Sequence, residues 1–417
     1  MWRPPAPFSD SQPALTERHA EGNPGSTPQT ATVFAVTRVL VVGGGIAGCM
    51  AAMSAAQAGS QATLVTRAPG ATALYSGGME IATDLKEMRA LAASQPYHPF
   101  VRLGLNDVEI VTLLDEVCYR VQSSLARNGL KLVGSWRTTG WYADVLGTVR
   151  PAHLVPDSVQ PGELGSLQGK RVAVVGVSAV GDYDAIAAAD ALTEAGVRAR
   201  PVIVGMDLPP AASLTDLYGR PAPHVREIAD AIAYPPGLVQ LPEIGFELLA
   251  AVPSPHGWRL QRALEAAVAE HGVQVVQSAV SAMTAEGRRL VAALTPGSEL
   301  AADEFVLATG RFLGGGLVKN RVVREPLCDL GVFHDGRRVD REWPERLRYL
   351  EYLSPHPAFR TGLLTDDRLR PLDWDGVAAY DNLRVAGSVL GGYDYIRGYG
   401  FGVPLVTGWL AGRWAAS

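Results

Sequence analysis

The stretch from residue 38 to residue 68, RVLVVGGGIAGCMAAMSAAQAGSQATLVTRA, constrains the fold more than any other part of the chain. It reads as a strand, a glycine turn, a helix of small residues and a second strand. Gly43, Gly45 and Gly48 have the G-x-G-x-x-G spacing, which permits a tight turn, phosphate access to the backbone and close helix packing. With Gly44, the turn predicts a mononucleotide or dinucleotide phosphate bound by N–H groups at the start of the helix.

Two alternatives compete with this phosphate site. Residues 39–66 contain no charged residue, and the stretch is long enough for a membrane span. Its three consecutive glycines, together with serine and glutamine, argue against a spanning helix. The other alternative is a β-α-β unit whose glycines serve only packing.

Length, charge and cysteine content exclude several classes of protein. A chain of 417 residues predicts two or three lobes, and a net charge of −5 offers no basic surface for nucleic acid. Cys49, Cys118 and Cys328 form no C-x-x-C pair, so we predict no disulfide framework and no metal or iron–sulfur site. Residues 1–37 are rich in Pro, Ser and Thr and lack the apolar core of a signal peptide, which predicts a disordered extension of a cytoplasmic protein.

Further elements follow from local patterns. Ser76, Gly77 and Gly78 form a small-residue loop that either approaches a planar ring or is an ordinary turn. Apolar spacing predicts a helix over 107–129. Residues 169–208 repeat the strand-turn-helix-strand pattern, but Ser178 replaces the second glycine, so a middle lobe is favoured over an NADH site. A helix over 258–274, a strand, a hairpin and a returning strand over 305–308 are expected next.

Three segments carry a resemblance to a known family: GGGIAGCMAA near the start, residues 307–327 and residues 382–412. Together they resemble the B subunits of anaerobic glycerol-3-phosphate dehydrogenase, and the similarity covers nearly everything after the N-terminal extension. In flavoproteins of this fold, the segment that here ends in Thr309 and Gly310 returns the chain to the glycine turn.

The resemblance implies a flavoprotein subunit that binds FMN, with FAD as the alternative. It implies two partners, a catalytic FAD subunit and an iron–sulfur subunit that ties the pair to the membrane. The complex oxidises sn-glycerol 3-phosphate to dihydroxyacetone phosphate and passes electrons to a quinone. We therefore expect a cytoplasmic protein held peripherally at the inner face of the cell membrane through a partner.

The resemblance also suggests residues that contact the flavin. Thr66 and Arg67 stand where an acid normally binds the adenosine ribose, which favours FMN, and Arg67 is either a phosphate ligand or a surface residue. Gly387 and Ser388 would lie beside the ribityl chain. The last helix would open with three glycines, interrupted by aromatic residues where the family often has Gly-Cys-Gly: Gly398, Tyr399, Gly400, Phe401 and Gly402.

Catalytic residues remain unassigned. Hydride abstraction from glycerol 3-phosphate needs a base and a phosphate-binding cation. The residues weighed for these roles have no diagnostic spacing, so we expect the base in the partner subunit: His98, His356, Arg324, Arg384 and Arg397.

The predicted fold is α/β, with a Rossmann-like flavin-binding domain of the two-dinucleotide-binding-domain type formed by residues 38–151 and 278–417. An α/β middle lobe, residues 152–277, is inserted between them. The alternative functions are a non-catalytic assembly subunit with a vestigial flavin fold, and a self-sufficient FAD oxidoreductase acting on another small hydroxy compound.

Overall fold

The computed structural model describes residues 36–82, 90, 93–252, 254–339, 356–394 and 400–417. All described residues belong to one compact unit, Val36–Ser417. The extension predicted over 1–37 therefore lies outside the described residues except for its last two. None of the helices in the described ranges has the length and apolar character needed to cross a membrane.

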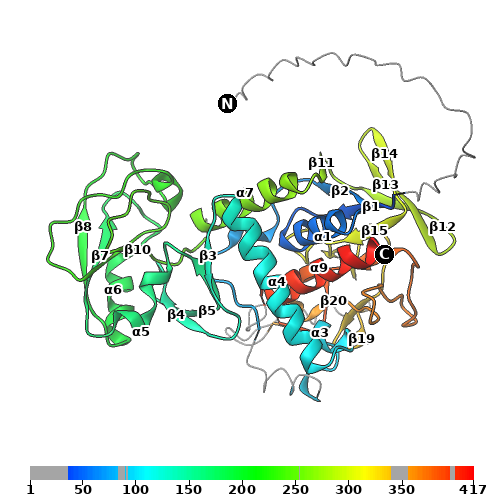
Figure 1. Ribbon diagram of the computed structural model, residues 1–417, viewed down its shortest axis with the longest axis horizontal. Coiled ribbons are helices and arrows are strands. Elements are labelled where there is room, and N and C mark those ends of the chain that lie inside the picture. Colours follow the sequence, from blue (N-terminus) through cyan, green and yellow to red (C-terminus); the bar gives the residue numbers. More distant parts are fainter. Residues whose placement is uncertain (1–35, 83–89, 91–92, 253, 340–355, 395–399) are drawn as a thin grey trace, which may run out of the picture. The chain divides into compact units, whose positions relative to one another are not determined.

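A parallel sheet of five strands forms the centre of the fold (Figure 1). Its order is β11 (Gln274–Gln277), β2 (Gln61–Thr66), β1 (Arg38–Val42), β15 (Glu304–Leu307) and β21 (Leu383–Val385). The central strands are short runs of valine, leucine and phenylalanine that are buried on both faces, as expected for parallel strands. The sheet joins strands from the beginning, the middle and the end of the sequence.

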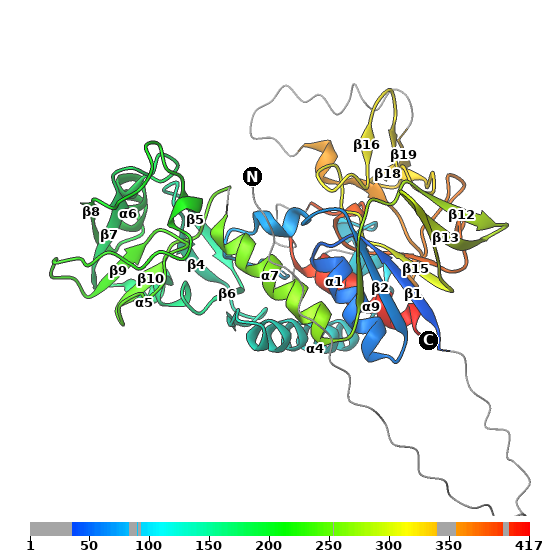
Figure 2. The ribbon, with the colours of Figure 1, turned by 90° about the horizontal axis from the view of Figure 1, so that it is seen from above.

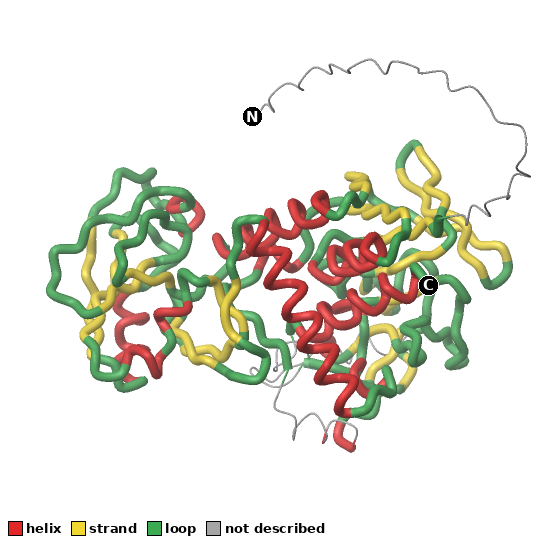
Figure 3. Tube along the Cα trace, in the orientation of Figure 1, coloured by secondary structure: helices red, strands yellow, loops and turns green. Residues whose placement is uncertain are grey.

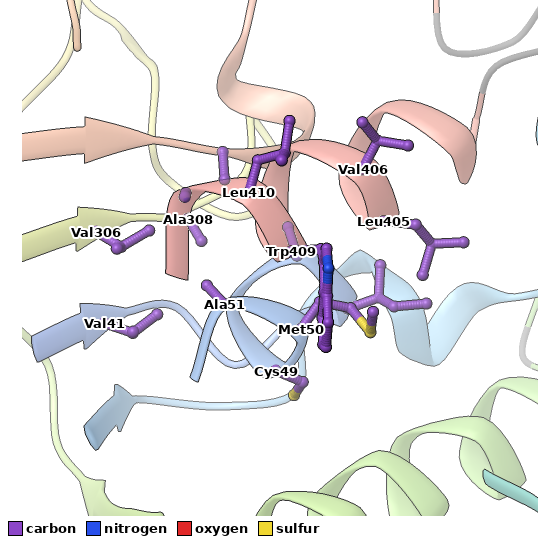
Figure 4. Close-up of a cluster of buried hydrophobic side chains, with 14 of the residues drawn as sticks. Val41, Cys49, Met50, Ala51, Val306, Ala308, Leu405, Val406, Trp409 and Leu410 are labelled. Carbon is purple, nitrogen blue, oxygen red and sulfur yellow. The ribbon is translucent and has the colours of Figure 1, made fainter. Parts of the chain in front are cut away.

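Four helices pack against one another beside this sheet, and they are red in Figure 3. They are α1 (Ile46–Gln57), α4 (Asp107–Arg127), α7 (Pro255–Glu270) and α9 (Gly402–Ala415). α1 is rich in alanine, so α9 approaches its backbone closely, and Cβ atoms at Gly408 and Gly412 would overlap the carbonyl oxygens of Ala47 and Ala51. Figure 4 shows Ala51 and Met50 of α1 next to Trp409 and Leu405 of α9.

Antiparallel strands cover the other face of the sheet, and Figure 2 shows β12 and β13 on the side of β1 opposite to α1. The meander consists of β12 (Ala282–Glu286), β13 (Arg289–Thr295) and β14 (Ser298–Ala301). A second small sheet has the order β19 (Arg337–Arg338), β18 (Val332–His334) and β20 (Thr361–Leu363), and β16 (Val318–Lys319) pairs with β17 (Val323–Arg324).

The middle of the chain has a sheet and a hydrophobic core of its own. The order is β10 (Gly245–Glu247), β9 (Ala231–Tyr234), β7 (Arg171–Val177) and β8 (Arg198–Val204), all parallel, with α6 (Ala185–Glu194) crossing between β7 and β8. Other short elements are β3 (Leu132–Gly134), β4 (Gly140–Ala143), β5 (Val149–Ala152), β6 (Leu154–Pro156), α3 (Pro99–Arg102), α5 (Leu164–Leu167), η1 (Ala71–Leu74), η2 (Gln160–Gly162), η3 (Leu214–Leu217), η4 (Pro357–Phe359) and η5 (Gly387–Val389).

The predicted fold class is confirmed, since the glycine turn connects a strand of a parallel sheet to a helix that packs beside that sheet. The helix predicted over 107–129 is α4, and the returning strand predicted over 305–308 is β15. The helix predicted over 258–274 begins and ends earlier, as α7. β11 pairs with β2, so the stretch 152–277 that we expected to form the inserted lobe ends with a strand of the five-stranded sheet.

Candidate flavin site

The glycine turn joins β1 to α1 and contacts the turn after β15. Gly43 has a φ of 120°, which only glycine adopts readily, and a Cβ atom there would overlap the carbonyl oxygen of Ala308. A Cβ atom at Gly48 would overlap the carbonyl oxygen of Gly43. These two glycines are therefore required by the packing of the polypeptide itself.

Gly45 differs from its neighbours because the protein leaves space beside it. Its φ of −76° and ψ of 176° suit any residue, and a Cβ atom would meet only the Thr72 hydroxyl oxygen, at 3.5 Å. Gly45, the N-cap residue of α1, provides no side-chain cap, and no acidic residue lies in the first turn of the helix. A phosphate next to Gly45 would thus meet the positive end of a helix whose N-cap residue carries no side chain, so these residues fit the phosphate of a flavin.

Thr72 contacts this turn, a contact that was not predicted from the sequence. Its hydroxyl oxygen accepts the Ile46 N–H at 2.9 Å, and it is buried on η1. The hydroxyl retains its own proton for donation to a ligand. A threonine in a run of small residues after β2 was the available signal.

The second β-α-β unit lacks such a helix end. The Asp184 side chain accepts the N–H groups of Ile186 and Ala187, at 2.9 and 3.1 Å, and so occupies the start of α6 with a carboxylate. A phosphate would be repelled there, which agrees with the interpretation of this unit as a crossover in a middle lobe.

The end of β2 places a hydroxyl over the glycine turn. A Cβ atom at Gly44 would overlap the Thr66 Oγ1 atom, and that hydroxyl donates to the Ala68 carbonyl at 3.0 Å. Arg67 follows with an exposed side chain, for which the described part of the chain provides no ion pair. The structure thus places the predicted phosphate ligand at the edge of the turn.

The turns after β15 and β21 lie together. A Cβ atom at Gly310 would come within 3.7 Å of the Ser388 hydroxyl, and one at Gly387 within 2.6 Å of the Ala47 side chain on α1. The N–H groups of Ser388 and Val389 have no acceptor among the residues that the structure describes. The Thr309 hydroxyl is buried without a hydrogen-bond partner among the described residues, and a Cβ atom at Gly316 would overlap it.

The glycines before the last helix are only partly described. Gly402 begins α9 and is fixed by packing, because a Cβ atom there would overlap the carbonyl oxygen of Ile81. Gly400 precedes it, and Phe401 packs edge-on against Tyr75 at 5.3 Å between ring centres. Gly398, Tyr399 and Arg397 lie outside the described residues.

The predicted loop Ser76–Gly78 contacts the middle part of the chain. A Cβ atom at Gly77 would lie 2.7 Å from the His256 ring, and the Ser76 carbonyl accepts the Ala250 N–H at 2.7 Å. Burial lowers the pKa of His256, and its Nε2 atom lies 3.1 Å from the Leu248 carbonyl oxygen. In the described structure the loop therefore serves packing, and a flavin contact stays a prediction.

Glu247 lies beside this loop and is completely buried. Burial alone would raise the pKa of its carboxyl group, but His256, Arg259 and hydrogen bonds from Arg259 and Ser158 together lower it. The Arg259 guanidinium lies 2.5 Å away and the Ser158 hydroxyl 2.6 Å away. The charge of this glutamate is thereby compensated inside the protein.

The two histidines weighed as bases act as helix caps. The Nδ1 atom of His98 accepts the Phe100 N–H at 3.1 Å, and that of His356 accepts the Ala358 N–H at the same distance. Each precedes a proline that starts a short helix. Because Nδ1 is occupied as an acceptor, the proton of a neutral ring resides on Nε2, and neither ring offers a free lone pair to a substrate.

Of the arginines weighed for the substrate phosphate, Arg324 and Arg384 are described, and they lie in different sheets. Arg324 is exposed on β17. Arg384 lies on β21 and pairs with Glu304 of β15 at 2.5 Å, which ties two neighbouring strands. A third arginine, Arg311, follows Gly310 directly and is buried, and no feature of the sequence predicted its burial.

Comparisons with known proteins agree with this geometry. A family model described as an FAD binding domain matches residues 38–215. The B subunit of the anaerobic glycerol-3-phosphate dehydrogenase of Yersinia enterocolitica is 30% identical, over 88% of this chain and 95% of that protein. The probable B subunit of the same enzyme of Halobacterium salinarum is also 30% identical, over 91% and 98%.

Among solved structures, the 3-ketosteroid-Δ4-(5α)-dehydrogenase of Rhodococcus jostii RHA1 is similar with a TM-score of 0.44 and 14% identity, over 93% of this chain and 99% of that one. The family model, over residues 38–215, shows that the chain contains a flavin-binding domain. We expected FMN, which the resemblance implies and which Thr66 and Arg67 favour. The match to an FAD domain does not support FMN and favours the alternative, FAD.

Proposed function

The chain belongs to the family of the B subunits of anaerobic glycerol-3-phosphate dehydrogenase, and we propose that it is the flavoprotein subunit of such an enzyme. The complex would oxidise sn-glycerol 3-phosphate to dihydroxyacetone phosphate and deliver the electrons to a quinone. The single observation that supports this most is the open space beside Gly45 at the start of α1, within a chain that matches these subunits over most of its length.

We propose FAD as the flavin, because the matching family model describes an FAD domain. The phosphate would lie at Gly45 and Thr72, and the ribityl chain next to Ser388. Flavin bound there would accept and release electrons. Heat release of the bound cofactor followed by chromatography distinguishes FAD from FMN, and FMN alone would contradict this assignment.

The partners follow from the same family. We propose a catalytic FAD subunit and an iron–sulfur subunit that anchors the complex at the inner face of the cell membrane. The cap roles of His98 and His356 support placing the catalytic base on the partner, since neither ring is available as an acceptor. In this arrangement the chain relays electrons between the other subunits.

Gly45→Asp tests the proposal in the purified complex. The backbone torsion angles and the space at Gly45 accept aspartate, which is itself a favoured N-cap, so the variant should fold. Its carboxylate would occupy the helix end and repel the flavin phosphate. We expect loss of this flavin and of electron transfer from sn-glycerol 3-phosphate to a quinone analogue.

Gly205→Asp is the matched control, because nothing lies within 4 Å of a Cβ atom there. It should retain the flavin and the activity. Full electron transfer in a Gly45→Asp complex that lacks this flavin would refute the relay.

A further inference from the structure

A buried glutamine of α7 contacts the glycine turn. α7 packs against α1, as Figure 2 shows, and Gln261 in its second turn is only 6% exposed. The Nε2 atom of Gln261 donates to the Gly44 carbonyl at 3.2 Å. The turn thus has a third polar side chain beside it, in addition to Thr66 and Thr72.

The side-chain amide of Gln261 has a fixed orientation. Its Nε2 atom also donates to the Glu265 carboxylate at 3.0 Å, one helical turn further along α7. Because a carbonyl and a carboxylate oxygen only accept hydrogen bonds, both contacts require the NH2 end of the amide at this place. The Oε1 atom of Gln261 therefore points away from both acceptors.

This Oε1 atom is a buried acceptor that has no donor among the described residues. A buried polar atom without a partner costs free energy, and native proteins contain few of them. A leucine at position 261 would avoid that cost. A glutamine kept here with one end unsatisfied indicates that a bound molecule supplies the donor.

The fold identifies the part of a nucleotide that lies next to Gly44. In a β-α-β unit of this kind the phosphate lies at the start of the helix, and an acid at the end of the second strand binds the ribose hydroxyl. Thr66 stands at that end of β2, and a Cβ atom at Gly44 would overlap its hydroxyl oxygen. Gly44 thus contacts both the usual ribose-binding position and Gln261.

We propose that Gln261 recognises the adenosine half of FAD, by accepting a hydrogen bond from a ribose hydroxyl in place of the acid that β2 lacks. This inference rests on the proposed function, with FAD as the flavin. Glu265 is a positioning residue, which holds the amide of Gln261 in the accepting orientation. Because FMN has no adenosine, this contact favours FAD over FMN.

Gln261→Leu tests the assignment in the purified full-length chain from which the flavin has been removed. Titration with FAD and with FMN, followed by flavin fluorescence, gives a Kd for each. We expect the Kd for FAD to rise about three- to tenfold, as for one lost hydrogen bond, and the Kd for FMN to stay the same. Glu265→Ala, at an exposed position, should raise the Kd for FAD by a smaller factor.

Gln122→Leu on α4 is the matched control, because it also removes a partly buried amide, which donates to the Leu132 carbonyl at 3.2 Å. It should leave both Kd values unchanged. If Gln261→Leu does not fold, Glu265→Ala decides, and an unchanged Kd for FAD in that variant overturns the inference.

The remaining outcomes separate this inference from the proposed function. An unchanged Kd for FAD in Gln261→Leu, or an equal rise for FAD and FMN, would overturn the inference alone, since an equal rise means that the glutamine only shapes the turn. A wild-type chain that binds only FMN would overturn it together with the FAD assignment. A wild-type chain that binds neither flavin would overturn the proposed function as well.

Discussion

At the scale of single residues, His98 shows how burial turns an apparent catalytic candidate into a structural one. Its ring is completely buried and caps α3. Burial, with a further effect of Arg360, lowers the pKa of His98 to about 3. The ring is therefore neutral in the folded protein across the physiological range.

This burial predicts a pH dependence of stability. The unfolded chain binds a proton at His98 below about pH 6.5, but the folded chain does not until about pH 3. The stabilisation that the neutral His98 ring contributes to the free energy of unfolding is thus complete above about pH 6.5. It decreases by up to about 1.4 kcal/mol per pH unit as the pH falls from about 6.5 to about 3. Urea unfolding at about pH 7 and about pH 5 measures the slope.

His98→Asn should flatten that slope, because the asparagine carbonyl can still accept the Phe100 N–H and does not titrate. His224→Asn, at an exposed histidine, serves as the control and should leave the slope unchanged. An unaltered slope in His98→Asn would assign the acid sensitivity to other groups.

Residue-scale prediction from sequence succeeded where the signal is local. The glycine spacing located Gly43, Gly45 and Gly48 correctly around one turn. It did not show that Gly43 and Gly48 serve packing and that only Gly45 leaves open space, because the contact that restricts Gly43 comes from Ala308, 265 residues later in the sequence. The roles of Gln261 and Thr72 depend on contacts of the same kind.

At the scale of elements, α1 and α9 pack closely through their backbones. Gly412→Ala places a methyl group against the Ala51 carbonyl oxygen, so we expect a loss of about 1–3 kcal/mol in the free energy of unfolding. Arg413→Ala, one residue further along the same helix and exposed, should change it by less than about 0.5 kcal/mol. Equal stability of Gly412→Ala and wild type would mean that the two helices shift apart freely.

The boundaries of a helix could be predicted where the capping residues at its ends were taken into account. α4 follows an Asn106 capping box and a clear apolar period, and the predicted range matches it closely. α7 was predicted to start at Trp258, but Ser254 caps it and Pro255 occupies its first position. Ser-Pro at the start and Gly272 after the end were the signals that would have given the correct range.

At the scale of the whole molecule, the main sheet depends on distant parts of the chain. β1 pairs with β2 on one side and with β15 on the other, and α9 packs on α1 from the C-terminal end. We expect the isolated fragment 36–151 to be unfolded by far-UV circular dichroism, because β1 would lack β15 and α1 would lack α9. A cooperative urea transition of this fragment would contradict that dependence, and the full chain provides the reference transition.

Local patterns could not reveal this arrangement in full. The strand at 274–277 was predicted as a strand, yet its periodicity carries no information on its partner, and β11 joins β2 more than 200 residues earlier in the sequence. The resemblance supplied the fold class because it spans distant segments together. The resemblance did not reveal which strand pairs with which.

The backbone at Gly45 adopts torsion angles that every amino acid tolerates, and its surroundings would admit a methyl group. Among the described residues, no contact requires this position to lack a side chain. In the proposed site the missing side chain leaves room for the flavin, so we expect sequence variation at position 45 to report on cofactor retention independently of stability.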